Sequence, residues 1–139
     1  MSLIEQVTPP GFASSLRLHH GEDEPMYVLE GRHTFWVGDR IVPAQAGTFG
    51  YLPRGVPRCL RVEGPAPGRL LQLTQPGGLE RGFQEMGSPA AGPVLPPPPA
   101  GPPDPAGLTR QQQITARHRV ELLGPPPGQP GFPLPEPHA

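Results

Sequence analysis

The sequence predicts an all-β domain in which short antiparallel strands form a barrel or sandwich. Between residues 16 and 74 the apolar residues come in short runs rich in β-branched and aromatic types, each bounded by Gly, Pro or Asp. These runs cover residues 26–29, 34–37, 48–52 and 69–73. Turn-forming pairs such as Glu30-Gly31 and Gly38-Asp39 separate them. No helical pattern occupies this stretch, so we expect an antiparallel sheet structure.

Composition divides the chain into three parts. The 25 prolines are concentrated after residue 88, whereas residues 1–87 have the composition of a folded domain. We expect residues 1–87 to form the barrel core and residues 88–123 a proline-rich wrap, a short helix and a closing strand. The prolines at 96–99 must be extended, because proline fixes φ and has no amide hydrogen to donate. We expect the proline-rich tail, residues 124–139, to be disordered.

The helix is expected from Leu108 to His118. Asp104 is suited to cap its N-terminus and Pro105 to occupy its first turn. Its inner face is expected to carry Leu108, Gln111, Gln112 and Thr115. Residues 120–123 then form a brief closing strand.

The charge balance limits the partners that the protein can bind. Eleven basic residues, all arginine, stand against 12 acidic ones, for a net charge of -1. Such a chain has no broad basic field for nucleic acid or an anionic membrane. The single Cys59 excludes an internal disulfide, and no apolar run approaches the roughly 20 residues of a membrane span. With no secretion signal evident, we expect a cytoplasmic protein.

Two spaced motifs identify a family resemblance. The pattern Gly11-x5-Arg17-x-His19-x4-Glu24-x6-Gly31 resembles the first cupin motif, G-x5-H-x-H-x3,4-E-x6-G. The pattern Gly47-x5-Pro53-x-Gly55-x2-Arg58 resembles the second, G-x5-P-x-G-x2-H-x3-N. The chain is therefore similar to small single-domain bacterial cupins of the quercetin-dioxygenase-like type. The resemblance implies a jelly-roll barrel, also called a double-stranded β-helix, around a central pocket.

The resemblance also implies a metal site, but two of its four positions carry arginine. His19 and Glu24 stand at ligand positions, whereas Arg17 and Arg58 replace histidines. A guanidinium is always charged and has no lone pair to offer a cation. We therefore predict no metal and no other cofactor; if a metal is bound, its protein ligands are His19 and Glu24.

The two arginines have two possible roles. Either one pairs with Glu24, because a buried charge without a counter-charge costs several kcal/mol, or one faces an open pocket and binds an enolate, carboxylate or phenolate. The cluster is then either structural or catalytic. On the catalytic reading, Glu24 and His19 are the acid and base and Arg17 or Arg58 stabilises an anion.

Several other side chains are candidates for contact with a small-molecule substrate, with core packing as the alternative for each. They are Met26, His33, Phe35, Trp36, Phe49, Gln72 and Phe83. His20 is expected at the surface, because strand alternation points it away from His19. Cys59 is expected to be a buried small residue.

Three functions fit these observations. The first is a metal-independent enzyme that cyclises, isomerises or dehydrates a small apolar, polyketide-like natural-product intermediate. The second is a metal-dependent, quercetinase-like dioxygenase, and the third is a cupin that only binds a small molecule or a partner protein. Because the resemblance implies more strands before the first motif than residues 2–8 provide, we also expect a homodimer that exchanges or adds N-terminal strands.

Overall fold

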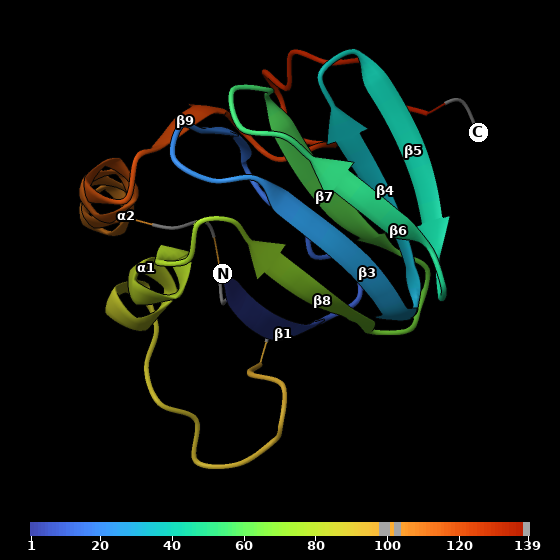
Figure 1. Cartoon of the computed structure of the whole chain (residues 1–139), viewed down its shortest axis with the longest axis horizontal. Coiled ribbons are helices and arrows are strands. Elements are labelled where there is room, and N and C mark those ends of the chain that lie inside the picture. Colours follow the sequence, from blue (N-terminus) through green and yellow to red (C-terminus); the bar gives the residue numbers. More distant parts are fainter. Residues whose placement is uncertain (98–100, 102–103, 138–139) are drawn as a thin grey trace.

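Two antiparallel sheets form the body of the molecule in the computed structural model, which describes residues 1–97, 101 and 104–137 (Figure 1). One sheet has the order β1 (Ser2–Thr8), β8 (Gly68–Thr74), β3 (Glu24–Glu30) and β6 (Phe49–Leu52). The other has the order β5 (Arg40–Gln45), β4 (Arg32–Val37), β7 (Arg58–Glu63), β2 (Leu16–His19) and β9 (Val120–Gly124). The all-β prediction is confirmed.

The core lies between the facing sheets. In β3, Glu24, Met26 and Val28 are buried whereas Tyr27 is exposed, as expected when successive side chains point to opposite faces. Met26 and Val28 pack in one cluster with Phe35 and Leu60 of the second sheet. Because Glu24 has the same parity as these core residues, the strand directs its carboxylate inward.

A glycine is required at the turn between β3 and β4. Gly31 has φ of 80°, and a Cβ at this position would lie 2.5 Å from the carbonyl oxygen of Pro67. Any other residue would be strained in conformation and would also clash with the backbone. The first motif therefore ends on a glycine for a steric reason.

Two helices pack against each other at one side of the sheets, with the first beside β1 of the first sheet and the second against β9 of the second sheet (Figure 1). The helix α2 (Pro105–Arg117) is confirmed, with the Asp104 side chain accepting a hydrogen bond from the Gly107 amide. Its expected inner face needs correction, because Leu108 and Gln112 are exposed and Ile114 is buried instead. The helix α1 (Leu79–Met86) was not predicted, since it is only two turns long and follows a glycine pair. No helix among the described residues is both long and apolar enough to cross a membrane.

Residues 125–137, where proline content predicts disorder, lie against the second sheet. Phe132 and Leu134 pack on the cluster of Leu16, Trp36 and Cys59. The Trp36 indole donates a hydrogen bond of 2.8 Å to the carbonyl oxygen of Pro135. The outer face of the sheet carries apolar side chains that need cover, which composition alone does not reveal. The extended run predicted at 96–99 lies partly outside the described residues.

Candidate functional site

The four motif residues meet where three strands begin or end. Glu24 begins β3, His19 ends β2 and Arg58 begins β7. Arg17 stands two residues before His19 on the same face of β2 and directly opposite Arg58 of β7. The period-two rule that places two histidines together in the family pattern thus places Arg17 and His19 together here.

Arg58 is the counter-charge of Glu24. Its Nη1 lies 3.0 Å from Glu24 Oε2, and both side chains are completely buried. The same guanidinium donates hydrogen bonds to the carbonyl oxygens of Leu52 and Pro53, at 2.8 and 3.2 Å. Burial lowers the pKa of the Arg58 guanidinium, and the Glu24 charge opposes that shift. The buried carboxylate is therefore compensated without a metal ion.

Amide groups hold the second oxygen of Glu24. The Gln72 side chain donates to Glu24 Oε1, and the Gln6 side chain in turn donates to Gln72 Oε1. This chain connects β3 through β8 to β1, the three neighbouring strands of the first sheet. It fixes the plane of the carboxylate, because one oxygen faces the amide and the other faces Arg58.

His19 lies between two carboxylates and Arg17. Its Nδ1 contacts Glu22 Oε1, and its Nε2 accepts a hydrogen bond of 3.1 Å from Arg17 Nε. The same Nε2 is 3.5 Å from Glu24 Oε2. In this arrangement Nδ1 carries the proton that is donated to Glu22, and Nε2 presents its lone pair. Glu22 was missed at the sequence level, where only its position three residues after His19 pointed to it.

The donors at the ligand positions are already engaged by arginine. The Nε2 lone pair of His19 meets the Arg17 guanidinium, and Glu24 Oε2 meets that of Arg58. The described residues contain no group of three or more His, Cys, Asp or Glu side chains arranged to hold a metal ion. Because guanidinium donates hydrogen bonds and cannot ligate, this donor set does not fit a divalent cation.

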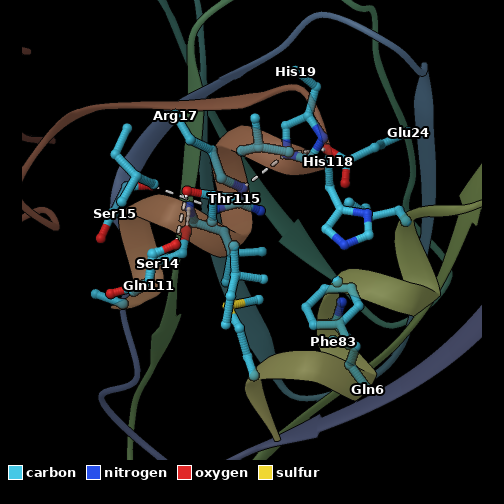
Figure 2. Close-up of a pocket in the computed structure, with 18 of the residues that line it drawn as sticks. Gln6, Ser14, Ser15, Arg17, His19, Glu24, Phe83, Gln111, Thr115 and His118 are labelled. Carbon is cyan, nitrogen blue, oxygen red and sulfur yellow. Dashed lines mark hydrogen bonds and ion pairs between the residues drawn. The ribbon is translucent and has the colours of Figure 1, made fainter. Parts of the chain in front are cut away.

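The cluster opens onto a cavity of about 250 Å³ between the barrel and the two helices (Figure 2). Arg17, His19 and Glu24 form its polar end. Most of its remaining wall is apolar, with contributions from Leu60, Leu79, Phe83, Met86, Ile114, Val120 and Leu122. Arg17 pairs with no carboxylate among the described residues. Its charge is therefore available to a ligand in the cavity.

The structure divides the expected substrate contacts among several places. Only Phe83 lines the cavity that contains Glu24. Met26, Phe35 and Phe49 line a second cavity, of about 210 Å³, between the strands β3, β4, β5 and β6. Gln72 is buried behind Glu24, as described above.

Two further candidates lie away from both cavities. Trp36 is on the outer face of its sheet, beneath Phe132, because it has the opposite parity to Phe35. His33 is buried beside Gly68, and neither of its ring nitrogens has a partner among the described residues. Burial lowers the pKa of this imidazole. His20 is half-exposed and pairs with Glu121 at 2.9 Å, and Cys59 is buried; both were expected.

Residues 4–74, just over half of the chain, match the family described as the cupin domain. The chain belongs to the cupin family. Among solved structures, this cupin is similar to TT1209 from Thermus thermophilus, with 31% identity over 50% of this chain and 67% of that one, at a TM-score of 0.48.

Two further solved structures are similar over part of their length. A predicted oxalate decarboxylase from Thermotoga maritima is 26% identical over 52% of this chain and 63% of that one, at a TM-score of 0.49. A sugar phosphate isomerase from Silicibacter pomeroyi is 21% identical over 52% and 48%, at a TM-score of 0.48. This cupin thus spans less than two thirds of either chain. No curated protein matches it.

Proposed function

We propose that this cupin is a metal-independent acid–base enzyme acting on a small, largely apolar molecule. Glu24 and His19 transfer the protons, and Arg17 stabilises an anionic oxygen of the substrate. The observation that carries the proposal is that the two arginines have different partners. Arg58 forms a buried ion pair with Glu24, whereas Arg17 lines the cavity without a carboxylate partner among the described residues.

The reaction class follows from the groups at the polar end of the cavity. The Glu24 carboxylate and the His19 imidazole, whose Oε2 and Nε2 lie 3.5 Å apart, can take a proton from one substrate atom and return it to another. The Arg17 charge stabilises the enolate that such a transfer creates. Isomerisation, cyclisation and dehydration of a polyketide-like intermediate all need this chemistry and no redox centre. The natural-product class rests on the resemblance to small bacterial cupins.

The apolar wall supports the same reading. An apolar wall lowers the polarity around the reacting atoms, which strengthens the interaction of Arg17 with a developing negative charge. It also favours a substrate whose body is a ring or a chain of carbon atoms. The polar end then selects for an enolisable carbonyl, a phenol or a carboxylate.

Metal analysis of the protein purified without chelator tests the first half of the proposal. We expect substoichiometric transition metal, because the donors at the ligand positions face guanidinium groups. Near-stoichiometric iron, nickel, manganese or zinc would contradict it. The dioxygenase alternative makes the opposite prediction, namely oxygen uptake with a flavonol that a chelator abolishes and Fe²⁺ restores.

Hydrogen–deuterium exchange at the α-carbon of acetophenone in D₂O, followed by NMR, tests the second half. We expect the wild-type protein to accelerate the exchange and Glu24→Gln to abolish the acceleration. Arg17→Gln should reduce it by about tenfold to a hundredfold, since it removes one stabilising cation. Arg69→Gln is the matched control, because Arg69 is a surface arginine paired with Glu5 and Glu30. Equal rates in the wild type and in Arg17→Gln would exclude the anion-stabilising role.

A further inference from the structure

A second histidine–carboxylate pair lies on the helical side of the cavity, apart from the motif residues. His118 lines the cavity, and its Nε2 is 2.8 Å from Glu85 Oε1 (Figure 2). In that view the His118 ring stands between the His19 and Glu24 side chains and Phe83. Neither His118 nor Glu85 belongs to either sequence motif. The cavity thus has titratable groups on both the barrel side and the helical side.

The backbone around His118 fixes the position of its ring. His118 follows the last turn of α2, and its amide hydrogen-bonds to the carbonyl oxygens of Ile114 and Thr115. The ring lies against Gly82 of α1, where a Cβ would come within 3.2 Å of His118 Cδ2. Glycine at this position therefore allows α1 to approach and to bring the carboxylate of Glu85, one turn later, to the imidazole.

The direction of the hydrogen bond between His118 and Glu85 is defined by the charge of Glu85. Hydrogen bonds from Arg117 and then from His118 lower the pKa of Glu85, so its carboxylate is ionised at neutral pH. Arg117 Nη2 is 2.6 Å from Glu85 Oε2, which leaves Oε1 for the imidazole. His118 Nε2 therefore donates to Glu85, and Nδ1 makes no hydrogen bond within the described part of the chain. A carboxylate that accepts from one imidazole nitrogen orients the ring and stabilises its imidazolium form, so the other nitrogen can take up and release a proton.

We propose that His118, oriented by Glu85, is a second proton-transfer group of this cavity and contacts an oxygen of the substrate other than the one that Arg17 binds. This inference rests on the proposed function. It narrows the substrate to an enolisable molecule with two oxygens, an acidic hydroxyl that Arg17 binds and a carbonyl oxygen that His118 contacts.

The proton balance closes in an isomerisation. Glu24 takes a proton from a substrate carbon while protonated His118 gives one to the carbonyl oxygen, and the enol forms. Glu24 then returns its proton to a different carbon, and His118 takes back the enol proton. Both groups are restored, and no oxidant or further reactant is needed.

Two probes that differ by one oxygen test the contact. The probes are 4-hydroxyacetophenone and 4-ethylphenol, with binding measured by calorimetry. We expect His118→Gln to weaken binding of 4-hydroxyacetophenone about tenfold and to leave 4-ethylphenol unchanged, since one hydrogen bond is lost. Glu85→Gln should reduce the same discrimination, because it frees the orientation of the ring.

The surface pair of His20 and Glu121 supplies matched controls. It has the same composition and a similar distance of 2.9 Å but lies outside the cavity. His20→Gln and Glu121→Gln should leave both affinities unchanged. The inference is overturned if His118→Gln affects both probes equally or neither, or if the wild type binds neither.

Arg17→Gln separates this inference from the proposed function. We expect it to weaken both probes, because both carry the phenol. If Arg17→Gln weakens both while His118→Gln changes neither, the proposed function stands and the role of His118 fails. If only His118→Gln has an effect, the role of His118 stands and that of Arg17 fails.

Discussion

The Glu24 carboxylate and the Arg58 guanidinium lie 3.0 Å apart, and neither side chain is accessible to solvent. Replacing one partner leaves the other as an uncompensated buried charge. We therefore expect Glu24→Gln to lower the free energy of unfolding by about 3–5 kcal/mol. Urea unfolding monitored by circular dichroism at neutral pH measures this change.

The double variant Glu24→Gln/Arg58→Met is the control for this pair. It removes both charges, so we expect it to cost less than the sum of the two single changes. Additive costs would contradict direct coupling between the two side chains.

A second prediction concerns the metal-ligand positions. Replacing Arg17 and Arg58 together by histidine removes both guanidinium groups and adds two imidazoles beside His19 and Glu24. Four such donors suit Zn²⁺ or Ni²⁺. We expect Arg17→His/Arg58→His to bind Zn²⁺ measurably by calorimetry, whereas the wild type does not. Binding by the wild-type protein with equal affinity would show that the arginines do not block the site.

A third prediction follows from the buried His33. The pKa of its imidazole is lowered from 6.5 by burial, so the unfolded chain takes up a proton at a higher pH than the folded one. The contribution of the neutral, buried His33 to the free energy of unfolding is therefore fully present above about pH 6.5 and is lost as the pH falls below that value. We expect the free energy of unfolding to decrease between about pH 7 and pH 5.

His33→Leu should flatten this dependence, because leucine does not titrate. His20→Gln, at a half-exposed histidine, should keep the wild-type slope. An unchanged slope in His33→Leu would assign the effect to another group.

A fourth prediction concerns the segment over Trp36. Phe132 meets the Trp36 ring edge-on, with the ring centroids 5.6 Å apart, and both pack in the cluster that contains Cys59. Burial raises the pKa of the Cys59 thiol to about 12, which suppresses the reactive thiolate. We expect Phe132→Ala to cost about 1–2 kcal/mol and to accelerate labelling of Cys59 by a thiol reagent.

Phe83→Ala is the control for this effect, since Phe83 is also partly exposed but lies in the cavity wall. It should leave the labelling rate unchanged. Equal rates in Phe132→Ala and the wild type would show that the segment does not protect the thiol.

A fifth prediction concerns the free edge of β1. This strand pairs with β8 of its own chain along its whole length and is the last strand of its sheet. Its exposed side chains include Leu3 and Val7. We propose that a second copy adds a strand at this edge, because unpaired edges favour such contacts. Light scattering should give a dimer for the wild type and a monomer for Leu3→Glu/Val7→Glu. A wild-type monomer would exclude the proposal.

The strand pattern predicted β3, β4, β6 and β8, and the motif spacing indicated that the cluster lies where the motif strands meet. Alternation along β3 directs Glu24 inward with Met26, and alternation along β2 places Arg17 beside His19. These relations are local, because two residues further along a strand always lie on the same face. The helix start at Asp104 was predictable for the same reason, since a cap acts within one turn.

The sequence by itself determined that two arginines stand where histidines would ligate, and only the tertiary structure decided that Arg58 pairs with Glu24 and Arg17 faces the cavity. That choice depends on how two sheets face each other, which residue types do not specify. The same holds for His118 and Glu85, which are 33 residues apart, one directly after α2 and the other in α1. It also holds for Trp36, which is covered by the segment around Pro135, 99 residues further along the chain. Contacts between segments far apart in the sequence arise when whole faces of sheets and helices pack together. Short sequence patterns carry no information on that packing.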